Sequence, residues 1–270
     1  MSFWKRLFGS TAESPDDPAK TRPDAPLLAT LGADMHSHIL PGLDDGADSV
    51  EAGVAIVREL AGLGYRHLIG TPHIMGDFYK NTPTGVRAAL AALTEAVAAQ
   101  NIAVTLDCAA EYYLDEWFLP RLTSAEGILS FGGEARYVLL ETSYINESRV
   151  LNQAIFELRA AGYQPIIAHP ERYKYLHGRL EEAAAWRDKG ALLQLNLNSL
   201  LGYYGPAERV AAEKLVDGGL IDFAGTDAHG RKHTTVLADL FTTAYLDKLL
   251  ALPLRNASLL PAPVTAAATL

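Results

Sequence analysis

Residues 34–47, DMHSHILPGLDDGA, decide how the rest of the chain is interpreted, because a short apolar run ends there and several polar side chains follow at once. His36 and His38 are one residue apart, and Asp44 and Asp45 directly precede a glycine. Taken alone, the stretch fits either a polar loop after a strand or a cradle for a metal ion. The order of elements along the remaining chain distinguishes the two.

Short apolar runs alternate with segments of helical spacing from residue 28 onward. The apolar runs lie near residues 29–35, 65–70, 102–109, 136–141, 164–168, 191–197 and 220–225. A helix is predicted after Asp48 as N-cap, with Glu51 three residues further on. Further helices are predicted at 84–99, 148–161, 179–188, 206–217 and 235–250. Seven strands, each followed by a helical segment, predict an α/β fold in which parallel strands form a barrel.

The N-terminal residues differ in composition from this pattern. Residues 9–27 are rich in Pro, Asp, Ser and Ala without periodicity, so residues 1–27 are predicted to be a tail and linker and residues 28–270 the folded domain. Residues 1–10 are apolar and basic, and they fit either a weak membrane-surface contact or the start of the linker. No apolar run approaches the ~18 residues of a membrane span.

Charge and cysteine content restrict the compartment and the partners. The 23 basic and 32 acidic residues give a formal charge of −9, which argues against a nucleic-acid partner, because phosphates are bound by a basic surface. An acidic protein with an anionic substrate needs local positive charge, which a bound divalent metal would supply. Cys108 is the single cysteine, so a cytoplasmic location is expected, at the inner membrane surface if the tail makes its contact.

Potential ligands follow six of the seven apolar runs. They are His36, His38 and Asp45, then His73, Glu111, Glu141 and His169 after successive runs, and Asp227 and His229 after the last. The sixth run offers Asn196 and Asn198 instead. Because active sites of parallel barrels lie at the carboxyl ends of the strands, these side chains are expected to converge. Nitrogen and oxygen ligands favour Mn, Fe, Zn or Co, and nine of them suit two or three ions.

The motifs DMHSHILPGLDDGA, GTPHIM, AAEYYLD, LLETSY, IIAHPERY and AGTDAHG together resemble those of the polymerase and histidinol phosphatase (PHP) superfamily. They look most like its bacterial protein-tyrosine phosphatase branch, which is associated with capsule and exopolysaccharide synthesis. The resemblance runs from about residue 33 to 255. It implies a distorted (β/α)7 barrel of the PHP type and a metal-dependent phosphoric monoester hydrolase that acts on phosphotyrosine.

The resemblance also implies three divalent metal ions, manganese above all. The implied ligand sets are His36, His38, Glu111 and Asp227 for the first ion, Glu141 and His169 with Glu111 as a bridge for the second, and Asp45, His73 and His229 for the third. Asp44 is the alternative to Asp45, which is preferred because it directly precedes the glycine. His67, His177 and His233 have no such placement and are expected to be structural or exposed.

Arg172 and Arg231 match the phosphate-binding arginines of that branch, and a guanidinium presents paired donors to phosphate oxygens. The implied substrate is a phosphotyrosine protein, in particular the tail of a tyrosine autokinase that controls capsular or exopolysaccharide synthesis. Three alternatives remain. They are a small-molecule phosphatase such as histidinol-phosphate phosphatase, a nuclease or polymerase-associated PHP domain, and a regulatory PHP module without activity.

A cysteine-dependent phosphatase mechanism is excluded by spacing. That chemistry needs an arginine six residues after the nucleophilic cysteine, and Leu114 stands six residues after Cys108. We therefore expect Cys108→Ser to retain most of the phosphatase activity of the wild type, measured as kcat/KM on a phosphotyrosine peptide. A thousandfold loss in a variant with an unchanged circular dichroism spectrum would contradict this expectation.

Overall fold

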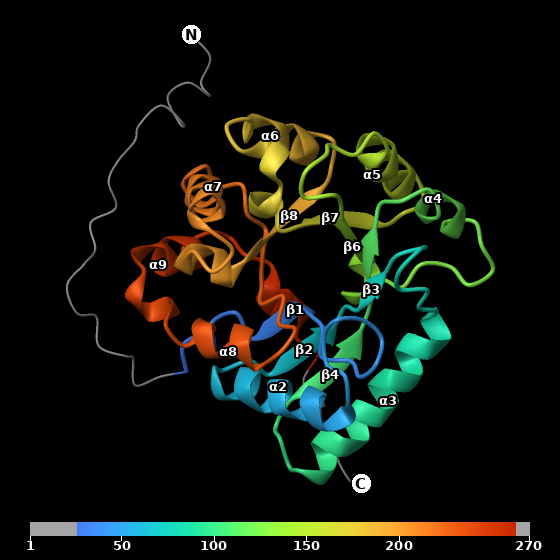
Figure 1. Cartoon of the computed structure of the whole chain (residues 1–270), viewed down its shortest axis with the longest axis vertical. Coiled ribbons are helices and arrows are strands. Elements are labelled where there is room, and N and C mark those ends of the chain that lie inside the picture. Colours follow the sequence, from blue (N-terminus) through green and yellow to red (C-terminus); the bar gives the residue numbers. More distant parts are fainter. Residues whose placement is uncertain (1–25, 263–270) are drawn as a thin grey trace, which may run out of the picture.

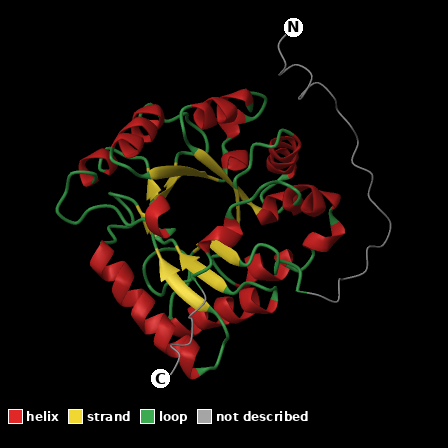
Figure 2. Cartoon of the chain, turned by 180° about the vertical axis from the view of Figure 1, so that it is seen from behind, coloured by secondary structure: helices red, strands yellow, loops and turns green. Residues whose placement is uncertain are grey.

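The computed structural model describes residues 26–262, and in it the helices surround a set of short parallel strands (Figures 1 and 2). The predicted membrane contact of residues 1–10 and nearly all of the linker lie outside the described residues. The strands are β1 (Ala33–Ser37), β2 (His67–Gly70), β3 (His73–Ile74), β4 (Thr105–Cys108), β5 (Glu111–Tyr113), β6 (Tyr137–Glu141), β7 (Gln164–Ala168), β8 (Leu192–Asn196) and β9 (Phe223–Gly225).

The helices alternate with these strands as the sequence predicts. They are α2 (Val50–Gly62), α3 (Pro83–Ala99), α4 (Phe118–Arg121), α5 (Leu151–Ala160), α6 (Glu181–Asp188), α7 (Pro206–Asp217), α8 (Arg231–Leu237) and α9 (Ala244–Leu250), with short 3-10 turns between them. None of the helices within residues 26–262 has the length and apolar character to span a membrane.

The second and third apolar runs form β2 and β4. After an interruption of two residues each is followed by a further short strand, β3 and β5, which the sequence did not predict, so the strands make two sheets, β1-β2-β4 and β3-β5-β6-β7-β8-β9. Pro72 lies in the first interruption and has no backbone N–H to donate. Hydrogen bonds still connect the chain segments there, from Ala109 N to Gly70 O (2.9 Å) and from Glu111 N to the Pro72 carbonyl (3.1 Å).

The ends of the strand order meet at β9 and β1, but no ladder pairs these two strands within residues 26–262. A parallel bridge joins Ser37 to Ala228, and backbone hydrogen bonds run from Asp227 N to His36 O (2.8 Å) and from His38 N to Ala228 O (3.0 Å). All strand pairs are parallel. The predicted α/β fold with a distorted arrangement of parallel strands is therefore confirmed.

Three local predictions were wrong. The first strand begins at Ala33 rather than near residue 29, because residues 27–31 form a turn. Ser49, not Asp48, caps α2 through its side-chain oxygen, which accepts a hydrogen bond from Ala52 N (3.2 Å). The helix predicted at 235–250 is divided into α8 and α9, because the Thr243 hydroxyl caps a new helix start at Tyr245 N.

Most strands are buried along their length, as expected of a parallel sheet covered by helices, whereas Thr105 and Asp107 of β4 are exposed. Along β6, Leu139 and Glu141 alternate with outward-facing residues, and along β8 Leu192 is followed on the same face by Gln194 and Asn196. Leu139 and Leu192 belong to a small apolar cluster. The polar members of these rows lie one or two pleats further toward the carboxyl ends of the strands, where they contribute to the site.

Asn256 substitutes for the missing ladder between β9 and β1. Its buried side chain accepts a hydrogen bond from Ala224 N (3.0 Å) and donates to Ala33 O (3.0 Å) and Ala224 O (2.7 Å). Asn256→Ala leaves these backbone groups unpaired, so we expect it to lower the free energy of unfolding by about 2–4 kcal/mol. Ser258→Ala, an exposed change in the same 3-10 turn, is the control, and equal urea midpoints for the two variants would contradict the expectation.

Candidate metal centre

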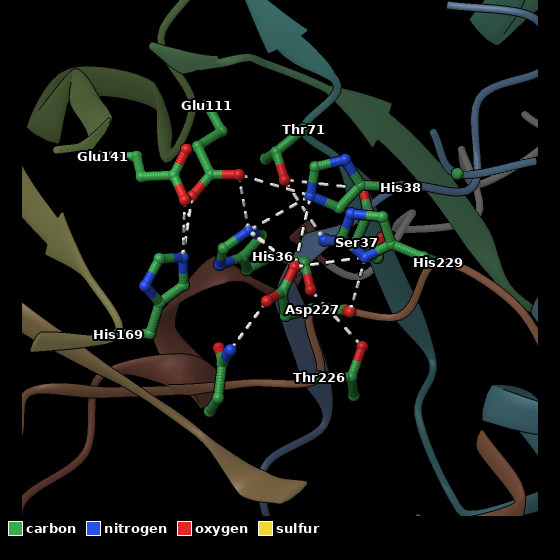
Figure 3. A network of polar contacts seen from close by, with 12 residues as sticks. His36, Ser37, His38, Thr71, Glu111, Glu141, His169, Thr226, Asp227 and His229 are labelled. Carbon is green, nitrogen blue, oxygen red and sulfur yellow. Dashed lines mark hydrogen bonds and ion pairs between the residues drawn. The ribbon is translucent and has the colours of Figure 1, made fainter. Parts of the chain in front are cut away.

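The carboxyl ends of the strands hold a cluster of histidines and carboxylates (Figure 3). His36, His38, Glu111 and Asp227 each offer a ligand atom, and these atoms lie within 4.8 Å of one another. This is the set that the sequence predicts for the first ion. His36 Nε2 is 3.1 Å from Glu111 Oε2 and 3.3 Å from Asp227 Oδ1, so the nitrogen and both carboxylate oxygens face a common point.

The set predicted for the third ion also comes together. Asp45, His73 and His229 group with His38, which the sequence assigned to the first ion alone. Asp45 Oδ1 is 3.8 Å from His73 Nε2 and 3.6 Å from His229 Nε2. The His38 and His229 rings stack with centroids 3.8 Å apart, so this group borders the first one directly.

The residues predicted for the second ion surround Glu111 from the other side. His169 Nε2 is 3.1 Å from Glu111 Oε1 and 3.5 Å from Glu141 Oε1. His73 also faces these two carboxylates and forms a possible ligand group with them. Glu111 therefore contacts both groups through its two oxygens, as a bridging ligand would.

Burial makes this concentration of charge unfavourable without a cation. The carboxylates of Glu111, Glu141 and Asp227 are all buried. Burial and the neighbouring Glu111 charge raise the pKa of Glu141 to about 8. Asp227 Oδ1 is buried without a hydrogen-bond donor among the described residues. A buried carboxylate oxygen in this state is destabilising unless a cation binds it, and the donor set of nitrogen and oxygen atoms fits divalent metal ions.

Burial and the neighbouring charges shift the pKa values of two of the histidines in opposite directions. Burial disfavours the charged form of His36, but the carboxylates of Glu111 and Asp227 outweigh it and raise the His36 pKa to about 9. Burial and the Arg172 guanidinium lower the pKa of His169 to about 4. His169 is therefore a neutral imidazole near pH 7, which is the form that binds a metal ion.

Two of the predicted ligands have a strained backbone. His169 (φ 31°) and Asp227 (φ 50°) lie in the left-handed region, which side chains other than glycine rarely adopt. Each directly follows or nearly follows a strand, β7 and β9 respectively. Strain of this kind persists where the surrounding structure holds a functional side chain in place.

Hydrogen bonds from the Nδ1 atoms of three histidines orient their Nε2 atoms into the cluster. His36 Nδ1 donates to Gln194 Oε1 (2.9 Å), His38 Nδ1 to Asp44 Oδ2 (2.7 Å) and His229 Nδ1 to the Asp227 carbonyl (2.9 Å). In each case Nε2 is left to face the carboxylates. Such outer contacts set the tautomer and orientation of a metal-binding histidine.

The same contacts distinguish Asp44 from Asp45. The Asp44 side chain is buried and accepts hydrogen bonds from His38 Nδ1 and from His73 N (2.8 Å). The Asp45 side chain is 57 % exposed and points toward His73 and His229. The geometry favours Asp45 as the ligand and gives Asp44 the task of orienting His38.

The sequence predicts no role for Gln194, and it places Asn196 at a strand end without assigning it a contact. Gln194 Nε2 donates to Asn196 Oδ1 (2.8 Å), and Asn196 Nδ2 donates to Asp227 Oδ2 (2.7 Å). A buried chain of amides thus links His36 to Asp227. The signal was present in the alternation of LLQLN, where two amides replace apolar residues on the inner face of β8.

The two predicted arginines lie in different places. Arg172 is beside the cluster, where Nη1 donates to Asp227 Oδ2 (2.8 Å) and the guanidinium lies between the rings of Tyr144 and Tyr204. The Arg231 side chain is 77 % exposed and pairs with Glu59 of α2 (2.7 Å). The structure therefore does not bring Arg231 into the cluster.

The remaining histidines and the cysteine are outside the predicted ligand sets. His67 contacts the Thr105 hydroxyl (2.8 Å), and His177 Nε2 donates to the Glu171 carbonyl (2.8 Å), as structural residues do. The His233 ring packs against His229 and Tyr203. Burial raises the pKa of Cys108 to about 11, so its thiol stays protonated near pH 7, in agreement with the exclusion of thiolate chemistry.

Known proteins resemble this chain over most of its length. Residues 32–239 match the family described as "Capsular polysaccharide synthesis, CpsB/CapC". The chain is 33 % identical over 203 residues to "Tyrosine-protein phosphatase YwqE" of Bacillus subtilis, which covers 74 % of this chain and 78 % of the relative. It is 30 % identical over 198 residues to "Putative tyrosine-protein phosphatase CapC" of Staphylococcus aureus, which covers 73 % of this chain and 76 % of the relative.

The fold also matches a solved structure. A chain from the crystal structures of YwqE of Bacillus subtilis and CpsB of Streptococcus pneumoniae superimposes with a TM-score of 0.70 at 30 % identity, over 83 % of this chain and 94 % of that chain. Those two proteins are described as unique metal-dependent tyrosine phosphatases.

The contact of Asp44 with His38 generates a test that needs no substrate. Asp44→Asn keeps the shape of the side chain but weakens the acceptor that orients His38, so we expect metal affinity to fall about 10- to 100-fold. Isothermal titration with Mn²⁺ measures this affinity. Asp48→Asn, an exposed change in the same loop, is the control, and equal affinities for the two variants would show that Asp44 does not orient a ligand.

Proposed function

Because this chain belongs to the CpsB/CapC family of capsular polysaccharide synthesis, we propose that its buried cluster is the metal centre of a protein-tyrosine phosphatase. The observation that carries the proposal is the arrangement around Glu111, whose two oxygens face separate groups of histidine and carboxylate ligands. Relatives at 33 % and 30 % identity are named as tyrosine phosphatases, which supports the same activity here.

Nine residues would hold three divalent ions, with manganese as the first choice. They are the three predicted sets, with His38 contributing to two of them: His36, His38, Glu111 and Asp227; Glu111, Glu141 and His169; and His38, Asp45, His73 and His229. Bound divalent ions would activate water at neutral pH and neutralise charge on phosphoryl oxygens. The surrounding protein contributes by orienting His36, His38 and His229 through their Nδ1 atoms.

Arg172 binds the phosphoryl group in this proposal. Its guanidinium already lies at the cluster and contacts the rings of Tyr144 and Tyr204, and the side chain is 20 % exposed, so donors remain for phosphate oxygens. Arg231 would have to leave Glu59 to take part. We retain Arg231 as the second phosphate-binding arginine of the proposal. This role requires Arg231 to exchange its ion pair with Glu59 for a contact with the phosphate.

The substrate is a phosphotyrosine protein that acts in capsular or exopolysaccharide synthesis, and a tyrosine autokinase tail is the form the resemblance implies. The capsule association of the family supports this class of substrate. A small-molecule phosphatase such as histidinol-phosphate phosphatase is the competing function on the same metal centre. A phenolate, with a pKa near ~10, leaves more readily than an alkoxide, which favours phosphotyrosine.

The direct test compares substrates at matched Mn²⁺. The purified protein is expected to contain roughly two to three divalent ions per chain, to lose activity with chelator and to regain it with Mn²⁺. Its kcat/KM is expected to be higher for a phosphotyrosine peptide than for a phosphoserine peptide or histidinol phosphate. Activity that is insensitive to chelator would contradict the metal centre, whereas a tenfold preference for histidinol phosphate would contradict only the substrate.

The arginines are tested by a second pair of variants. Arg172→Ala removes a donor to the phosphoryl group while the ligands stay, so we expect a loss of about 2–4 kcal/mol of transition-state stabilisation in kcat/KM. Arg231→Ala is expected to cost less, because Glu59 competes for its guanidinium. If Arg172→Ala retains full kcat/KM with normal metal content, the assigned role is wrong.

A further inference from the structure

A cavity of ≈ 420 Å³ opens beside the metal centre. Asp45, His73 and Glu141 of the cluster form part of its wall, and the remaining wall comes from the segments that follow β3 and β6 and from β5 between them. Whatever binds at the cluster therefore has direct access to this cavity. The nine proposed ligands and Arg172 do not account for the other residues that line it.

Aromatic rings form much of the wall. Tyr79 stacks on His73 with ring centroids 5.6 Å apart and an angle of 13° between the rings. Tyr144 donates its hydroxyl to Glu141 Oε1 (2.5 Å), which directs the ring along the cluster. Tyr113 also lines the cavity. Both Tyr79 and Tyr144 are thus positioned by residues of the metal centre, and they offer faces and edges to a further aromatic ring.

The outer rim of the cavity is apolar and exposed. Phe78 is 78 % and Ile145 is 68 % exposed, although both are large hydrophobic residues. They come from different segments, one after β3 and one after β6, and both line the same cavity. Exposed apolar groups that meet at the rim of a polar site are typical of surfaces that a partner covers.

The charge of the cavity excludes a second phosphate site. Asp45 and Glu141 are acidic, and the described lining residues include neither lysine nor arginine. The nearby cation is Arg172, whose guanidinium carbon lies 4.5 Å from the centroid of the Tyr144 ring. The anionic group of a substrate is therefore directed to the cluster and Arg172, and an uncharged aromatic group to the cavity.

We propose that this cavity binds the phenyl ring of phosphotyrosine, and that Phe78 and Ile145 contact the peptide residues on either side of it. This assignment rests on the proposed phosphatase function and names the determinants of its specificity. A phosphoserine side chain lacks a ring to fill the cavity, so it leaves the aromatic wall and the apolar rim without contacts.

The test measures a ratio, kcat/KM for a phosphotyrosine peptide divided by kcat/KM for phenyl phosphate, at matched Mn²⁺. Phenyl phosphate carries the ring without the peptide. Phe78→Ala and Ile145→Ala are each expected to lower this ratio about three- to tenfold, the range expected when an apolar contact with the peptide is lost. Phe78→Tyr, which keeps the ring, is expected to retain the ratio.

Phe156→Ala is the matched control, because Phe156 is also 68 % exposed but lies on α5 and does not line the cavity. It is expected to leave both rates unchanged. An active enzyme whose ratio is the same in Phe78→Ala, Ile145→Ala and Phe156→Ala would overturn the role of the rim alone. A wild-type protein that hydrolyses neither ester with Mn²⁺ would overturn the phosphatase function and the cavity's role with it.

Discussion

The contact of Glu111 with histidines on both sides is the interaction on which the site depends. Its carboxylate is fully buried, with Oε2 3.1 Å from His36 and Oε1 3.1 Å from His169. A buried carboxylate next to Glu141 and Asp227 would be strongly destabilising if these charges had no partner. In the proposed metal centre divalent cations would provide that partner, so metal binding and the stability of the strand ends are expected to be linked.

The fold supports this concentration of charge by holding it rigidly. Parallel strands place their carboxyl ends at one edge, and the helices lie around the outside of the strands (Figure 1). At the junction of β9 and β1, where no ladder forms, Asp34 accepts hydrogen bonds from Thr226 N (3.0 Å) and from the Thr226 hydroxyl (2.6 Å). This side chain contact anchors the residue that precedes Asp227 and so fixes the strained backbone of that ligand.

The site has two chemically different sides. Arg172, between two tyrosine rings, supplies a fixed positive charge at the cluster. The cavity next to His73 and Glu141 supplies aromatic faces and an apolar rim without a cation among its described lining residues. A phosphate monoester of a phenol matches both sides at once, because a single ester oxygen separates its anionic and aromatic parts.

The sequence by itself predicted the fold class, and it predicted that the nine candidate ligands would lie close together. Apolar runs that end in His36, Glu141 or His169 predict strand ends, and the carboxyl ends of parallel strands meet at one edge whatever the packing details. The direction of each side chain was decided only by the tertiary structure. Adjacent Asp44 and Asp45 diverge into a buried acceptor and an exposed ligand candidate because the loop turns between them.

The sequence also did not predict which side chains far apart in the chain form hydrogen bonds or ion pairs. Arg231 pairs with Glu59, 172 residues away, and Gln194 accepts a hydrogen bond from His36, 158 residues away. Local spacing shows which residues end a strand, because that depends on neighbours along the chain. It does not show which side chains meet across the fold, because that depends on how helices and strands pack against one another.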